Sequence, residues 1–222
     1  MKFERAAFTE ELSTFGDLPF LESLLDQGHG ITSLESELYS KYRQEGKLEE
    51  AKMAVSKLQK GVDYAKALFP KVKPYIDRKL SNLGYKVETY EKIDDPKIIP
   101  LRLPSRTIEG EIESEGRKEQ VYGFSGAAAG VTCYRCNTPE GYLMFANLPL
   151  AHLSQEDVNP MGLHEYIHIY LSKLGISDEK QKSLEPYIDT WVVGILHDRG
   201  EHELAEKYRR NSGYLNRPSY IV

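Results

Sequence analysis

Cysteine is scarce in this sequence, which contains only Cys133 and Cys136 among its 222 residues. Two cysteines cannot build the dense disulfide framework of a small secreted domain. Their CxxC spacing is half of a structural zinc site, but no second pair completes it. A redox pair normally opens a helix, whereas this pair closes the strand-like run GVTCYRC. We therefore interpret both cysteines as small strand residues near a turn.

Long apolar runs and a strong charge of one sign are also missing. No run approaches the roughly 18 consecutive apolar residues of a membrane-spanning helix. The N-terminal run MKFERAAFTEELSTF carries acidic side chains where a signal peptide has an unbroken apolar segment. The net charge is −5, from 29 basic and 34 acidic residues, so a nucleic-acid partner is not expected. We expect a cytoplasmic protein that binds neither membranes nor nucleic acid, and the sequence does not define its oligomeric state.

The first part of the chain has helical periodicity. Thr9 is a candidate N-cap for one helix, and Thr32 with Glu35 forms a capping box that opens the longest helical segment. Pro70 and Pro74 interrupt that pattern, because proline removes a backbone donor and clashes with the preceding turn. We predict that residues 1–84 form a helical N-terminal region, as a hairpin or bundle.

The middle of the chain changes to short runs rich in β-branched and aromatic residues, which turn-forming residues separate. This composition is typical of a small, mainly antiparallel sheet, so the fold class is α+β. The predicted strands are residues 85–93, 105–114, 119–126, 130–136 and 142–150.

Helical signals return in the last part of the chain. Asn159 is a candidate N-cap, and Pro160 suits the first position of a helix that ends at Gly175. Ser177 is a candidate cap for a second helix that runs to about residue 197. A short helix over residues 201–210 follows.

The first of these helices carries the motif HExxH, as His164, Glu165 and His168. Two histidines four residues apart lie on one helical face, so both imidazoles can reach one zinc ion. Glu165 then lies beside the open coordination position, where it can act as general base. The alternative is that two histidines of an ordinary amphipathic helix match the pattern by chance.

A third ligand is expected on the second helix. A catalytic zinc site has three protein ligands and one open position. If the two helices fold back on each other at Gly175, Glu185 lies level with the histidines and can reach the same ion. Asp189 lies one turn further on the same face, where it can accept a hydrogen bond from His164. Spacing alone leaves open which of the two carboxylates is the ligand.

The pattern of HEYIH followed by EPYID resembles the gluzincin class of zincin metallopeptidases, of which thermolysin is a familiar member. The resemblance covers residues 164–189. It implies that His164, His168 and Glu185 are the metal ligands, that Glu165 is the general base and that Asp189 supports the first histidine. It also implies a zincin-like catalytic domain over residues 85–222, with the metal site on the C-terminal helices.

Two further roles are expected of such a peptidase. Zincins place a substrate-binding edge strand before the motif helix, and Phe145, Ala146 and Asn147 occupy that position here, although an ordinary core strand would have the same composition. A donor that stabilises the oxyanion is also useful, and His197 and Tyr214 are candidates. A histidine at a helix C-terminus more often complements the helix dipole.

The sequence therefore predicts a zinc-dependent hydrolase that acts on a peptide or protein. One alternative is a hydrolase that acts on a non-peptide amide. Another is a metal-binding or regulatory protein without catalysis, in which four protein ligands would close the site. The presence of Glu165 argues against a zincin that has lost activity by losing its base.

Overall fold

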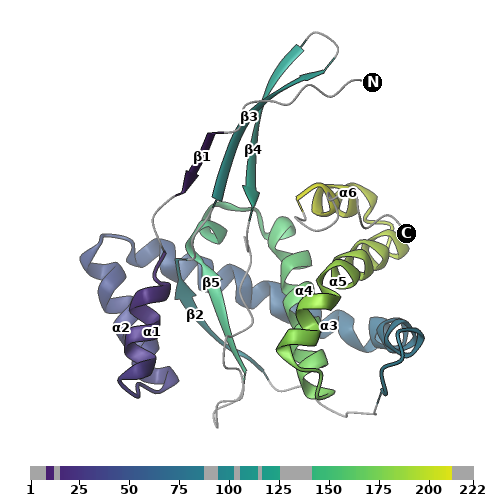
Figure 1. The fold of residues 1–222 in the computed structure, drawn as a ribbon, viewed down its shortest axis with the longest axis horizontal. Coiled ribbons are helices and arrows are strands. Elements are labelled where there is room, and N and C mark those ends of the chain that lie inside the picture. The colour runs from purple at the N-terminus through teal and green to yellow at the C-terminus, as the bar shows by residue number, and fades with distance from the viewer. Residues whose placement is uncertain are drawn as a thin grey trace.

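The computed structural model describes residues 9–12, 16–87, 95–102, 106–114, 117–125 and 142–211. Within these residues the fold is a mostly helical α+β arrangement (Figure 1). None of the helices in these ranges combines the length and the apolar character that crossing a bilayer requires. The α-helices are α1 (Leu18–Asp26), α2 (Ile31–Gln44), α3 (Leu48–Asn82), α4 (Gln155–Lys173), α5 (Asp178–Asp198) and α6 (His202–Asn211). The strands are β1 (Thr9–Leu12), β2 (Lys97–Leu101), β3 (Arg106–Ser114), β4 (Arg117–Ser125) and β5 (Leu143–Asn147), and a 3-10 helix, η1 (Leu148–His152), follows β5.

Helix α3 is continuous, so the predicted interruption at Pro70 and Pro74 is wrong. Both prolines lie on the exposed face of α3, where water can bond to the carbonyls that lose a partner. The opposite face buries Leu68, Phe69 and Val72 in the core. Burial of this face outweighs the cost of two prolines, which local propensity alone would not predict.

The helix predicted after Thr9 is also wrong, because Thr9 begins strand β1 instead. Strand β1 pairs antiparallel with β3, and Thr9 lies opposite Glu109. Strands β3 and β4 form an antiparallel hairpin in which Ser114 lies opposite Arg117. Figure 1 shows this three-stranded sheet projecting away from the helices. It accounts for two of the strands predicted from the sequence.

Strands β2 and β5 form a separate parallel pair, so a single mainly antiparallel sheet is only part of the fold. A parallel pair needs a crossover connection, and the chain between residues 101 and 143 provides it. The run KIIPL of β2 was not predicted as a strand, although a short apolar run is typical of a strand with both faces covered. Of the strand predicted over residues 85–93, residues 85–87 are not in a strand and residues 88–93 lie outside the described residues, as does the strand predicted over residues 130–136.

The parallel pair separates two apolar cores. Phe145 of β5 packs with α1 and α2 in an N-terminal core, whereas its neighbours Met144 and Ala146 pack with α3, α4 and α5 in a helical core. Figure 1 shows α3 crossing the molecule from the α1–α2 side to the α4–α5 side. Because α3 contributes to the same core as α4 and α5, the long helix directly supports the two helices that carry His164, His168 and Glu185. The division of the chain at residue 84 stays a prediction.

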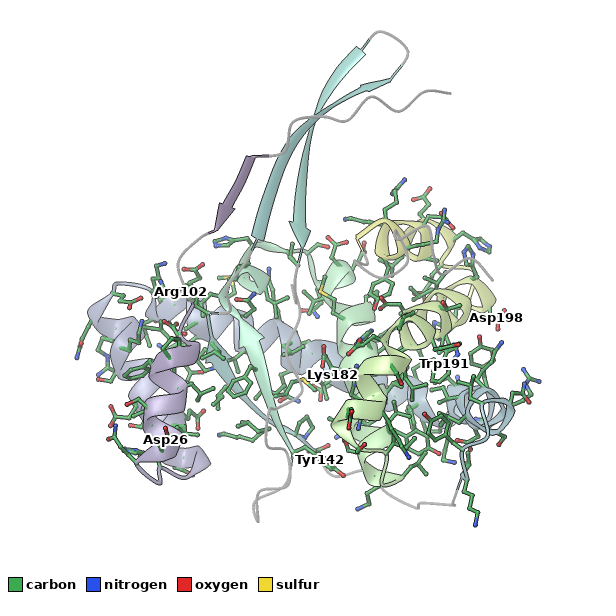
Figure 2. The ribbon with its side chains drawn as sticks, in the orientation of Figure 1. Asp26, Arg102, Tyr142, Lys182, Trp191 and Asp198 are labelled. Carbon is green, nitrogen blue, oxygen red and sulfur yellow. The ribbon has the colours of Figure 1, made fainter. Side chains whose placement is uncertain are left out.

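A buried carboxylate joins the N-terminal core to β2. Asp17 is only 2% exposed and accepts hydrogen bonds from the Tyr42 hydroxyl at 2.6 Å and from the Arg102 guanidinium at 3.0 Å. The Lys41 ammonium lies 2.9 Å from the same carboxylate. Figure 2 shows Arg102 on the side of the molecule formed by α1 and α2. The hydrogen bonds and ion pairs with these three residues offset the free energy that it costs to bury the negative charge of Asp17.

Helix α4 begins one turn earlier than predicted. Ser154 is the N-cap and accepts a hydrogen bond from the backbone N–H of Asp157 at 3.2 Å. Asn159 and Pro160 therefore lie inside the helix, and Pro160 is buried. The prediction of Asn159 as N-cap is wrong because Ser154, which comes earlier in the chain, already accepts a hydrogen bond from a free N–H of the first turn. The helix can continue through Pro160 because the proline removes only one internal hydrogen bond.

Helices α3 and α4 cross at two glycines. A Cβ atom on Gly162 would lie 2.3 Å from the carbonyl carbon and 2.5 Å from the carbonyl oxygen of Gly61. Backbone atoms cannot move away from such a contact as the end of a flexible side chain can. This close crossing holds the helix that carries HExxH against α3.

Gly162→Ala should therefore lower the free energy of unfolding by about 3 kcal/mol or more, since it overpacks a contact between two backbones. Gly194→Ala is the matched control, because its Cβ would meet only the Tyr75 hydroxyl at 3.0 Å. We expect the control to stay within about 1 kcal/mol of the wild type. Urea denaturation measures both, and equal stability of the two variants would contradict the glycine crossing.

Candidate metal centre

A tight turn at Gly175 fixes how α4 and α5 face each other. Gly175 has a φ of 75°, a left-handed conformation that glycine adopts without strain. Its N–H donates to the Ser172 carbonyl at 2.9 Å, and the N–H of Ile176 donates to the Leu171 carbonyl at 3.0 Å. This is the Schellman pattern of a helix C-terminus. Because α5 begins at residue 178, the turn leaves no freedom for the second helix to slide along the first.

The resulting alignment brings three side chains of α4 and α5 together. The Nε2 atoms of His164 and His168 lie 3.1 Å apart. Glu185 places Oε2 at 3.1 Å from Nε2 of His164 and Oε1 at 3.2 Å from Nε2 of His168. His164, His168 and Glu185 thus form a group that could hold a metal ion.

The spacing of these atoms fits zinc. Tetrahedral zinc with ligands at about 2.0–2.1 Å has its ligand atoms about 3.3 Å from one another. The two Nε2 atoms, at 3.1 Å, and the pair of His164 Nε2 with Glu185 Oε2, also at 3.1 Å, come close to this value. The 3.2 Å distance to His168 is made by the other oxygen of Glu185, so one ligand atom from each residue lies within 4.8 Å of the others. Imidazole nitrogen and carboxylate oxygen are also donor types that zinc accepts. The residues present therefore fit a zinc ion in both geometry and chemistry.

The hydrogen-bond partner of His168 defines which ring nitrogen carries its proton. Gln181 accepts from Nδ1 of His168 through its Oε1 at 2.9 Å. The amide of Gln181 cannot be reversed, because its Nε2 donates to the Ile176 carbonyl at 2.8 Å and to Ser172 Oγ at 2.9 Å. Nδ1 of His168 is therefore the protonated nitrogen. Its Nε2 keeps a lone pair that points at the other two side chains.

His164 is oriented in the same way by a buried carboxylate and a half-buried tyrosine. Its Nδ1 lies 2.9 Å from Oδ1 of Asp189 and 3.0 Å from the Tyr208 hydroxyl. The Tyr208 hydroxyl donates to Asp189 at 2.7 Å, so the remaining donor, Nδ1–H of His164, also serves the Asp189 carboxylate. A histidine that gives one N–H to a carboxylate presents the other nitrogen as a ligand. Asp189 lies at the ring edge opposite the proposed ligand atom.

If both histidines are neutral and carry their proton on Nδ1, their Nε2 atoms and the Glu185 carboxylate are all acceptors. No hydrogen-bond donor then lies between them. A proton on Nε2 of His164 gives this contact a donor, at 3.1 Å from Oε2 of Glu185. Burial opposes a charged His164, but hydrogen bonds to Asp189 and Glu185 outweigh it and hold the pKa of His164 well above its usual range. Burial would raise the pKa of Glu185, but the hydrogen bond with His164 lowers it instead. The same electrostatic preference for a positive charge favours a divalent cation.

Glu165 lies close to this group. Its side chain is buried, at 6% exposed, and its negative charge raises the pKa of both His164 and Tyr208. The two histidines of the HExxH motif meet Glu185, as the sequence predicted, and the role of Glu165 as general base stays a prediction. Asp189 also lies where the sequence predicted it, behind His164.

Gln181 and Tyr208 are the residues of the centre that the sequence analysis missed. Gln181, Glu185 and Asp189 follow one another in steps of four on α5, so the periodicity that indicated the two carboxylates could also have indicated Gln181. No comparable signal exists for Tyr208. Its position depends on the packing of α6, which the buried Ala205 and a 2.6 Å ion pair between Lys207 and Asp157 hold in place.

The other predicted site residues lie apart from the three ligands or outside the described residues. Phe145, Ala146 and Asn147 form the predicted strand, β5, with all side chains buried, and substrate binding by it stays a prediction. His197 lies twelve residues beyond Glu185, about 18 Å along α5, and contacts α6 instead of the ligands. Tyr214 and both cysteines lie outside the described residues.

No family model, no curated protein and no solved structure matches this chain. The resemblance to gluzincins therefore depends on the residues between His164 and Asp189 and on their geometry. The geometry supports a metal centre without the help of any relative.

Tyr208→Phe should weaken zinc binding by about tenfold or more, the effect usual for groups that orient a ligating histidine. The hydroxyl is lost while the ring that packs α6 against α5 is kept. Tyr187→Phe, at a tyrosine of α5 that is 47% exposed, is the matched control and should bind zinc as the wild type does. Competition with a chromophoric chelator measures both affinities. Equal affinities in the two variants would remove Tyr208 from the centre.

Proposed function

We propose that this protein is a zinc-dependent hydrolase that cleaves peptide bonds, with Glu165 as general base. The observation that carries the proposal is the convergence on α4 and α5 of three side chains that could hold a metal ion, next in sequence to a buried glutamate. Two histidines and one carboxylate are a ligand set of catalytic zinc, which keeps a fourth position for water or substrate.

A site with three protein ligands is typical of catalytic zinc, whereas structural zinc has four. His164, His168 and Glu185 are the only group of three or more suitable side chains found in the described ranges. Asp189 does not add a fourth ligand, because it faces the opposite nitrogen of His164. Glu185 is 20% exposed and His164 is 12% exposed, so water can approach from the side of these two residues.

Each residue has a defined task in this mechanism. His164, His168 and Glu185 hold the ion, which supplies a Lewis acid that acidifies water and polarises a carbonyl group. Glu165 accepts a proton from the attacking water and delivers it to the leaving amine. Asp189, Tyr208 and Gln181 keep the ligand rings in one orientation, so the site needs little rearrangement during the reaction.

A non-catalytic metal-binding protein is the second candidate. The observation that favours it is the depth of the site, since His168 is only 5% exposed and the ligands and their partners join α4, α5 and α6. A metal ion there would stabilise the packing of three helices. The two candidates differ in whether Glu165 is required for any reaction.

Glu165→Gln should retain one bound zinc but lower the cleavage rate by at least about 100-fold, because a general base contributes roughly 10²–10⁴ to the rate. Glu156→Gln is the matched control, since Glu156 is an exposed glutamate of the same helix and should leave the rate unchanged. Mass spectrometry of a peptide mixture follows the reaction without a known substrate.

Two outcomes would contradict this proposal. A zinc-loaded Glu165→Gln variant that cleaves as fast as the wild type would exclude Glu165 as the base. A wild-type protein that binds zinc and cleaves neither peptides nor simple amides would favour the non-catalytic candidate.

A further inference from the structure

A second pair of histidines meets where α5 ends and α6 begins. Nδ1 of His197 lies 2.9 Å from Nδ1 of His202, and the two ring centroids are 5.2 Å apart. Two nitrogen ligands of one tetrahedral zinc ion would be about 3.3 Å apart. A small opening of the two rings therefore accommodates an ion between them.

The backbone between these histidines is held in one conformation. Gly200 has a φ of 78°, and its N–H donates to the His197 carbonyl at 2.9 Å. The N–H of Glu201 donates to the Leu196 carbonyl at 2.9 Å, which completes a Schellman turn. Glu201 is also tied to Arg199 through a 2.7 Å bond. Because the turn is fixed, metal binding requires side-chain rotation and transfer of the proton between the two Nδ1 atoms to Nε2 of His202, and little backbone entropy is lost.

A carboxylate lies behind one of the two rings. Oε1 of Glu206 is 3.4 Å from Nε2 of His197, while Oε2 of the same residue pairs with Arg209 at 2.7 Å. The negative charge favours the proton of His197 on Nε2, so that Nδ1 presents its lone pair toward His202. Nδ1 of His197 then accepts a hydrogen bond from Nδ1–H of His202 at 2.9 Å. A histidine with a carboxylate behind one ring nitrogen and a lone pair on the other is the arrangement that metal sites use.

We propose that His197 and His202 form a second metal site, which binds a borderline transition-metal ion such as Zn²⁺ through the two Nδ1 atoms. Imidazole selects this class of ion, whereas Mg²⁺ and Ca²⁺ require oxygen ligands. His197 is 38% exposed and His202 is exposed, so water molecules complete the coordination. About 18 Å of helix separates this pair from Glu185, and the proposal does not depend on the proposed function.

The site should be weaker than the centre on α4 and α5 by at least about tenfold. It offers two protein ligands instead of three, and both remain in contact with solvent. Zinc should therefore fill the centre at His164, His168 and Glu185 first and the pair at His197 and His202 second.

Calorimetric titration with Zn²⁺ tests this order. The full chain with Cys133→Ser and Cys136→Ser, which removes thiol ligands, should bind two equivalents. Adding His202→Ala should abolish the weaker equivalent and leave the tighter one unchanged. His152→Ala is the matched control, because His152 is also exposed and lies 3.1 Å from a carboxylate, that of Glu50. The control should keep both equivalents.

A second measurement, by NMR, identifies which ring nitrogens bind the metal ion. In long-range ¹H–¹⁵N spectra of the histidine rings, the second equivalent of Zn²⁺ should shift Nδ1 of both His197 and His202, and Mg²⁺ should shift neither. The proposal is overturned if His202→Ala keeps the weaker equivalent, or if the second equivalent leaves both rings unchanged. Loss of the tighter equivalent alone would instead contradict the centre on α4 and α5.

Discussion

The alignment of α4 against α5 is the constraint on which the candidate metal centre depends. The Schellman turn at Gly175 determines which side chains of the two helices meet. A shift of α5 by one residue would rotate Glu185 by about 100° and turn it away from the histidines. The same alignment places Gln181 against His168 and Asp189 against His164. One turn thus determines both the ligands and the groups that orient them.

The remaining structure holds this helix pair in place. Helix α4 crosses α3 at Gly162, where two backbones touch, and α3 extends through the helical core past β2 and β5. Trp191 of α5, labelled in Figure 2, is only 2% exposed and belongs to the same core. Helix α6 then adds Tyr208 from a third direction. Buried polar groups of the centre are therefore surrounded by packed apolar side chains, which strengthens their electrostatic interactions.

Local patterns in the sequence were sufficient to predict the parts of the centre that lie on one helix. Four-residue spacing indicated His164 with His168, and Glu185 with Asp189, since helical periodicity is a property of the chain itself. Helices α5 and α6 were predicted close to their observed limits for the same reason. Across the two helices, the short turn at Gly175 was enough to indicate that Glu185 meets the two histidines, whereas Gln181, which bonds to His168, was missed.

The features that the sequence could not indicate depend on contacts between distant segments. Tyr208 reaches His164 only because α6 packs beside α4, and Thr9 forms a strand only because β3 is available to pair with it. Helix α3 continues through Pro70 and Pro74 because its other face is buried. In each case the free energy of packing against distant segments outweighs the local conformational preference. The sequence of one segment alone does not contain this contribution.

X-ray absorption at the zinc edge tests the central claim most directly. The protein would be loaded with Zn²⁺ and dialysed, so that only tightly bound metal remains. The account predicts about one equivalent of zinc with two imidazole ligands, oxygen as the remaining ligand type and no sulfur, and loss of this metal in Glu185→Ala. Protein that holds no zinc after loading, or a spectrum dominated by sulfur, would contradict a centre formed by His164, His168 and Glu185.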